Sequence, residues 1–171
     1  MCLLTSCNHE QKLFWNLQEA RRETDRARPF AEELSKTPEG TRLALEDMDV
    51  FGGSTRGWSS WILIESSLAT EIEPKLKEII SDQSIDPSKR IEAAHIMWAR
   101  TKDTIYLEKM FAMVRGPGDQ ATEWGRRKLA TSIESEEMAK RLMLPPTEPI
   151  QLKDDDFHSL IKDPQNLRMP K

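Results

Sequence analysis

Long hydrophobic runs are missing from this sequence. Its apolar stretches, such as residues 61–64, are far shorter than the ~20 residues that a membrane-spanning helix needs. Cysteine is also scarce, because Cys2 and Cys7 are the only two and both precede the first helical pattern. Neither has a second Cys or a His pair at zinc-ligand spacing. The sequence therefore predicts a soluble body without a disulfide framework or a structural metal.

An excess of charge of one sign is absent as well. The chain has 29 acidic and 25 basic residues, intermixed, and a net charge of −4, which gives no strong attraction to nucleic acid or anionic lipid. Aromatic residues make up 6%, whereas 37% of residues are hydrophobic and 32% charged. This composition, with few β-branched runs, favours helices with wide solvated faces. A chain of 171 residues buries roughly two-thirds of its unfolded surface, enough for one core.

Catalytic motifs are not found. His9, His95 and His158 lie far apart in the chain, and we expect none of them to pair with a second His or a carboxylate at the spacing of a metal-binding helix. No Gly-x-Ser-x-Gly turn occurs. The glycine-rich residues 52–57 lack the preceding strand and the Lys of a phosphate-binding loop, and the three acids at 154–156 lack the Gly and distal Glu of a calcium loop. We therefore expect a protein that is not an enzyme and that carries no metal and no cofactor.

Apolar residues recur at helical steps along most of the chain. Leu13, Phe14, Leu17 and Ala20 predict a first helix over 10–27, which Pro29 is expected to end or kink, with 30–36 as a short continuation.

Further helices are predicted from capping residues and prolines. Thr37 before Pro38 and Asp86 before Pro87 are typical of helix starts. The sequence also predicts that Ser54 or Thr55 caps a helix that runs through Leu68, that Pro74 starts the next one, and that Asp103 and Asp119 cap two more.

The predicted fold class is all-α, with about seven to nine helices and no sheet. Residues 1–9 are expected to be a disordered or tethering N-terminus, residues 10–144 a single helical domain, and residues 145–171 a Pro-rich extended tail. Within that tail, 154–161 form at most one short helical turn.

The helix pairs expected near Thr55, Asp86 and Asp119 recur at intervals of about 31 to 33 residues, a period typical of stacked two-helix units. Residues 86–94 resemble the start of a HEAT or armadillo-like repeat, in which an Asp or Pro opens the helix, an Arg follows and paired small residues let helices touch. Residues 119–129 are a fainter copy. This resemblance covers 55–143 and implies stacked antiparallel helix pairs in a short solenoid or bundle, usually a curved binding surface.

The N-terminal sequence Leu3-Leu4-Thr5-Ser6-Cys7 resembles the end of a bacterial lipoprotein signal, in which the Cys receives the lipid. If the start codon lies upstream, Cys7 would be the lipidated first residue of a periplasmic, membrane-anchored protein, and this lipid would be its only membrane contact. If Met1 is the true start, the protein would be cytoplasmic.

Candidate binding residues remain once catalysis is set aside. Trp15 lies off the stripe that Leu13 and Leu17 define, and an exposed Trp is a candidate interface anchor. Arg115, Arg126, Arg127 and Lys128 are candidate phosphate contacts at one end of the stack.

Two functions are consistent with these residues. We expect a noncatalytic protein-binding module, such as an immunity protein, an inhibitor or an adaptor. The alternative is a HEAT-like nucleic-acid-binding protein that uses the Arg and Lys residues between 100 and 128. The first is favoured because acidic residues such as Asp103, Glu108, Asp119 and Glu123 interrupt the basic ones.

Overall fold

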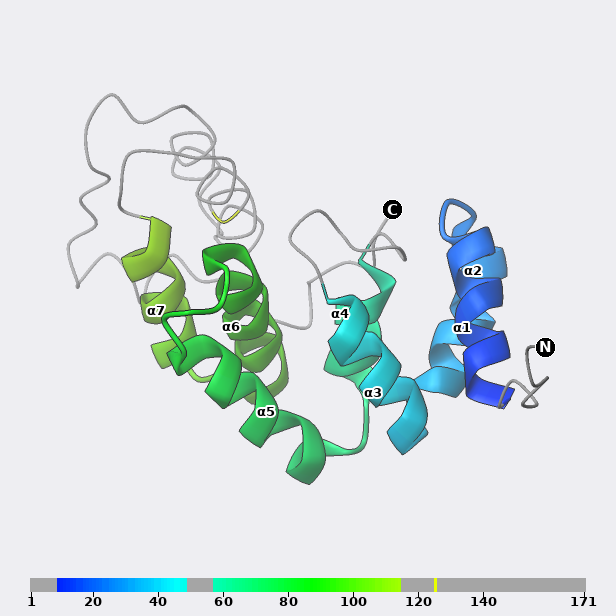
Figure 1. The fold of residues 1–171 in the computed structure, drawn as a ribbon, viewed down its shortest axis with the longest axis horizontal. Coiled ribbons are helices and arrows are strands. Elements are labelled where there is room, and N and C mark those ends of the chain that lie inside the picture. The colour runs from blue at the N-terminus through cyan, green and yellow to red at the C-terminus, as the bar shows by residue number, and fades with distance from the viewer. Residues whose placement is uncertain (1–8, 49–56, 115–124, 126–171) are drawn as a thin grey trace, which may run out of the picture. The chain divides into compact units, whose positions relative to one another are not determined.

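The computed structural model describes residues 9–48, 57–114 and 125, and their fold is all-α, as the sequence predicts. No strand occurs in these ranges. Figure 1 labels the seven helices that they form: α1 (His9–Ala20), α2 (Thr24–Leu34), α3 (Pro38–Asp47), α4 (Trp58–Glu65), α5 (Ala69–Ser81), α6 (Pro87–Thr101) and α7 (Ile105–Val114).

Two compact units divide the chain within α5, after Ile72. The first contains α1 to α4, and the second contains α6, α7 and most of α5. The single domain over 10–144 stays a prediction. The predicted tail over 145–171, and the N-terminal segment up to residue 8, lie outside the described residues.

In the first unit, α1 packs against α2 and α3, and α4 packs against α2 and α3 (Figure 1). The buried face of α2 consists of Ala27, Ala31 and Leu34, which lie at steps of four and three residues and so share one side of the helix. Two alanines in this face let the neighbouring helices approach closely. Leu17 on α1 and Ile62 on α4 complete this core without exposed surface.

Two helix starts agree with the capping prediction. The side chain of Thr37 accepts a hydrogen bond from the amide of Gly40 at 3.0 Å, and Pro38 follows at the first helical position of α3. The side chain of Asp86 accepts a hydrogen bond from the amide of Ser88 at 2.9 Å at the start of α6. In both cases the cap satisfies an amide that has no partner within the helix.

The helix end predicted at Pro29 and the helix start predicted at Pro74 were wrong. Pro29 lies inside α2 and Pro74 inside α5, whereas the first break falls at residues 21–23, between α1 and α2. A proline removes one amide donor, and in α2 and α5 the helical turns on both sides continue around this gap. Here α2 stays helical because its buried face of alanine and leucine side chains packs against α1 and α4.

The start and end of α4 also differ from the prediction. Gly57, rather than Ser54 or Thr55, occupies the capping position. Its φ of 93° lies in the left-handed region, which favours glycine. The helix ends at Glu65 instead of continuing through Leu68, and Ser66 Oγ accepts a hydrogen bond from the Leu68 amide at 3.2 Å.

The second unit is built around α6, which is buried on all sides from Ile91 to Trp98. It packs against α7, and these two helices form the pair that was predicted to begin near Asp86. Asp103 Oδ1 accepts a hydrogen bond from the Ile105 amide at 3.1 Å, as predicted for the cap of α7. Arg90 Nε donates to the carbonyl oxygen of Ile80 at 3.2 Å, which ties α6 to the end of α5.

Candidate functional site

Trp15 is the most exposed large hydrophobic residue described, with 60% of its surface accessible. Its exposure follows from the pattern of α1, because Leu13, Phe14, Leu17 and Ala20 are the residues that this helix buries against its neighbours. Trp15 falls on the opposite side of the helix from that stripe. The structure thus places the indole on the outer face of α1, as its position off the stripe suggests.

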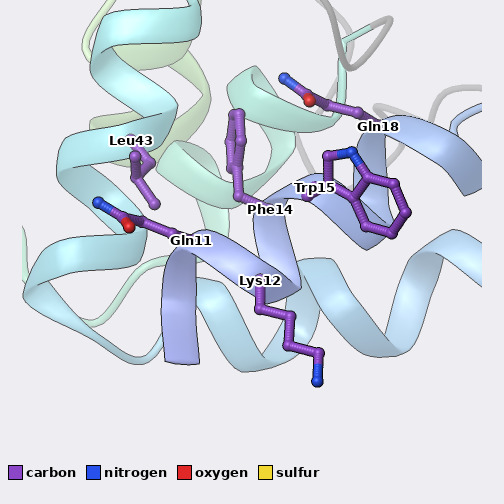
Figure 2. A pocket seen from close by; sticks show the side chains of 6 residues that line it. All are labelled: Gln11, Lys12, Phe14, Trp15, Gln18 and Leu43. Atoms are coloured by element: carbon purple, nitrogen blue, oxygen red, sulfur yellow. The ribbon is translucent and has the colours of Figure 1, made fainter. Parts of the chain in front are cut away.

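A hollow of about 530 Å³ lies beside Trp15, between α1 and α3. Figure 2 shows the six side chains that line it: Gln11, Lys12, Phe14, Trp15 and Gln18 from α1, and Leu43 from α3. In this view, Phe14 stands between the two helices, with Leu43 on one side and Trp15 on the other. Phe14 is only 8% exposed, so it belongs to the core as well as to the wall of the hollow.

Apolar carbon makes up most of the wall of this hollow, and the polar groups lie at its rim. Among the lining residues, Lys12 is the only charged one, whereas Gln11 and Gln18 offer neutral amides. These groups can donate and accept hydrogen bonds without the large cost of desolvating a charge. The combination suits an apolar anchor that is surrounded by hydrogen-bonding groups.

The charges on α3 next to the hollow are neutralised within the helix. The guanidinium of Arg42 donates two hydrogen bonds of 2.7 Å to Glu39 and also pairs with Glu46. The hydrogen bond from Arg42 holds the pKa of Glu39 below its ordinary value of 4.5, against a smaller effect of burial, and these carboxylates raise the pKa of Arg42. Leu43 therefore stands next to a compact charge cluster that is already paired.

Most of the predicted basic residues fall outside the described part of the chain. This applies to Arg115, Arg126, Arg127 and Lys128, and to the proposed lipidation residue Cys7. Among the other Arg and Lys residues between 100 and 128, Arg100 lies inside the second unit. Its side chain is 7% exposed, and its Nε is 3.8 Å from Glu73 Oε1. Lys102 is exposed at the C-terminal cap of α6, with a φ of 59°.

Two buried titratable residues were not recognised together from the sequence. Glu92 and His95 lie three positions apart in α6 and are both buried, and the His95 ring centroid is 6.3 Å from that of Trp98. The spacing itself would have revealed this pair, because residues three apart share a helix face.

Neither a metal-binding cluster nor a membrane-spanning helix occurs in the described ranges. Residues 9–48, 57–114 and 125 contain no group of three or more His, Cys, Asp and Glu residues that could hold a metal ion. Over the same residues, every helix is too short or too polar to cross a membrane.

Comparisons with models of protein families, with curated proteins and with solved structures found no match to this chain. A fold in any case does not determine a function, which depends on the chemistry of a site. In the described residues, the hollow beside Trp15 joins an exposed aromatic side chain to an apolar surface.

Proposed function

We propose that the protein is a noncatalytic protein-binding module, of the kind that serves as an inhibitor, an immunity protein or an adaptor. The supporting observation is the 60% exposure of Trp15 at the edge of an apolar hollow. A buried Trp side chain removes some 150–250 Å² of surface from water, and Trp is enriched among the residues that dominate binding energy at protein interfaces.

The surroundings of Trp15 support this proposal. Protein interfaces are depleted of charge at their centre and have a polar rim that supplies hydrogen bonds. On α1, Gln11 and Gln18 lie four and three positions from Trp15 and share its side of the helix. Leu43 adds apolar surface from α3. These residues form a surface with an aromatic centre and an amide rim, which we call the Trp15 face: Gln11, Lys12, Trp15, Gln18 and Leu43.

The lining of the hollow favours binding over catalysis. Apart from the Lys12 amine, its six side chains contain neither a nucleophile nor a general base. A catalytic site needs a nucleophile or base that is oriented by a second group, and no lining side chain is placed to orient Lys12 in this way.

Nucleic-acid binding has less support from the described residues. Such a surface needs Lys and Arg side chains that reach phosphates from the outside. Arg100 is instead enclosed within the second unit near Glu73, and Arg42 is held between two carboxylates. The Arg100 side chain is therefore too enclosed to reach a polyanion, and the charge of Arg42 is already paired within α3.

A capture experiment with matched variants tests the proposal. The full chain, Trp15→Ala and Ile105→Ala are immobilised separately and exposed to extracts of the cells that make the protein, and the bound proteins are quantified by mass spectrometry. Ile105 is the matched control because it is the other exposed large hydrophobic residue described, at 45%.

We expect at least one protein other than this chain to be retained by the wild type and by Ile105→Ala, and to be reduced ~30-fold or more by Trp15→Ala, since a Trp at the centre of an interface contributes about 2 kcal/mol or more. Equal retention by all three forms would contradict the role of Trp15. Capture of nucleic acid alone would contradict the proposed function.

A further inference from the structure

We propose that the Trp15 face also binds a second copy of this chain, through an antiparallel contact between the two α1 helices around a two-fold axis at Trp15. This inference rests on the proposed function, because it uses the same binding surface. It adds the identity of a partner, which we argue from the placement of charge and amide groups on α1.

The outer face of α1 carries two rows of polar side chains, with Trp15 between them. In a helix with 100° per residue, positions seven apart lie within about 20° of each other. Lys12 and Glu19, both exposed, therefore form one row, and Gln11 and Gln18 form the other. Trp15 lies about 40–60° from the members of each row and near the midpoint of both along the helix axis.

A two-fold axis beside Trp15 turns these rows into complementary pairs. In an antiparallel arrangement, Lys12 faces the partner's Glu19, and Glu19 faces the partner's Lys12. The symmetry likewise places Gln11 opposite the partner's Gln18, where two amides can each donate and accept a hydrogen bond. A parallel arrangement around a two-fold axis would instead place the row of Lys12 and Glu19 opposite the partner's row of Gln11 and Gln18, so that no oppositely charged side chains would face each other. The charges on α1 thus favour the isologous, antiparallel contact that forms closed dimers.

The hollow provides space for the central aromatic residue. Its volume of about 530 Å³ falls within the ~300–1,000 Å³ typical of sites that enclose small organic ligands. Phe14 and Leu43 supply an apolar wall. In the two-fold arrangement, the partner's Trp15 enters this hollow and Trp15 enters the hollow of the partner, so that both exposed indoles leave water together.

The proposed contact is small, since each copy contributes mainly one helix. Interfaces that bury less than about 1,200 Å² in total are typical of weak or transient complexes. We therefore expect a dissociation constant of about micromolar or weaker, and a protein that changes between one and two copies over an accessible concentration range.

Sedimentation equilibrium of the full chain tests this inference at about 10 to 500 µM, a range chosen to span micromolar dissociation constants. The average mass of the wild type should rise from 19.7 kDa toward twice that value. Ile105→Ala should behave as the wild type does, and Trp15→Ala should stay at 19.7 kDa. A wild type that stays at one chain throughout would overturn the inference.

Variants with a reversed charge at position 12 or 19 test the antiparallel orientation of the two α1 helices. Lys12→Glu and Glu19→Lys should each weaken association about fivefold to tenfold, because each replaces two attractive pairs by two repulsive ones at an exposed position. An equimolar mixture of these variants should regain wild-type association, since every Glu at 12 or 19 then faces a Lys on the other copy. A mixture as weak as the separate variants would overturn the antiparallel pairing.

The two proposals fail in different ways. If the wild type stays monomeric but still captures another protein through Trp15, only the second-copy inference is overturned. If the chain pairs with itself through Trp15 and captures no other protein, the inference stands and the proposed adaptor or inhibitor function is overturned.

Discussion

Trp15 on α1 and Leu43 on α3 line the same hollow, although they belong to different helices. The hollow therefore exists only while α1 is docked on α3, and the core residue Phe14 lies in its wall. The same packing of α1 on α3 thus stabilises the fold and forms the proposed binding surface. Substitutions of Trp15 and of Phe14 can separate these two roles.

Trp15→Ala should leave stability nearly unchanged, whereas Phe14→Ala should reduce it strongly. An exposed substitution changes the free energy of unfolding by about 0.5 kcal/mol or less, whereas truncation of a buried Phe costs about 3–5 kcal/mol. Urea denaturation of both variants measures the difference. A similar loss of stability in both would mean that Trp15 belongs to the core.

Gly125→Ala should destabilise the second unit. A Cβ atom at this position would lie 2.6 Å from Val114 Cγ1 and 2.7 Å from Ile91 Cδ1, both closer than packed carbon atoms allow. Forcing an extra methyl into such a core costs about 1–3 kcal/mol. Thermal denaturation measures the loss. Adding Val114→Ala makes room for the methyl group, so the double variant should lose less stability than the sum of the two single losses. Strict additivity would contradict this contact.

The features that could be predicted from the sequence are those that depend on adjacent residues. Thr37 and Asp86 form their caps with amides two or three positions away, so a short stretch contains the whole interaction. The prolines were misread because a proline can be tolerated inside a helix when tertiary packing holds the flanking turns, and Pro29 lies between the buried Ala27 and Ala31. The exposure of Trp15 followed from its position on α1. The hollow could not be predicted, because Leu43 reaches it only through the packing of α1 on α3.

The cap of α6 should make stability depend on pH in the acid range. Hydrogen bonds from Ser88, first from its side chain and then from its amide, lower the pKa of Asp86 below its ordinary value of 3.8. The folded state therefore favours the carboxylate, and its contribution is present above pH 3.8 and lost as the pH falls through the lower folded pKa.

Asp86→Asn isolates this effect, because Asn caps a helix about as well as Asp but does not titrate in this range. Urea denaturation between about pH 5 and pH 2 should show the wild type losing stability relative to Asp86→Asn as the pH falls. Parallel curves for the two proteins would contradict the shifted pKa. Asp86→Ala should cost about 1 kcal/mol at neutral pH through loss of the cap.

Tyr106 should titrate above the ordinary tyrosine range. Burial raises its pKa above 10.0, and the negative charges of Asp103 and Glu73 raise it further. Because Tyr106 is the only tyrosine, the phenolate absorbance reports this one group, and its midpoint should fall to about 10 in urea. The neutral phenol is favoured in the folded state, so this contribution to stability is complete below pH 10.0 and disappears as the pH rises through the folded pKa. A midpoint at or below 10.0 in the folded protein would contradict the burial of this side chain.

Photo-crosslinking in living cells tests the Trp15 face most directly. A benzophenone amino acid is placed at Gln11, which lines the hollow, or at the control position Gln83, an exposed glutamine in the loop after α5. Upon irradiation, the Gln11 position should give covalent protein adducts, including one with twice the mass of the chain, and these adducts should disappear when Trp15→Ala is added. The Gln83 position should give none of them. Equal adducts from both positions, or adducts at Gln11 that persist without Trp15, would contradict the assignment of this face as the binding surface.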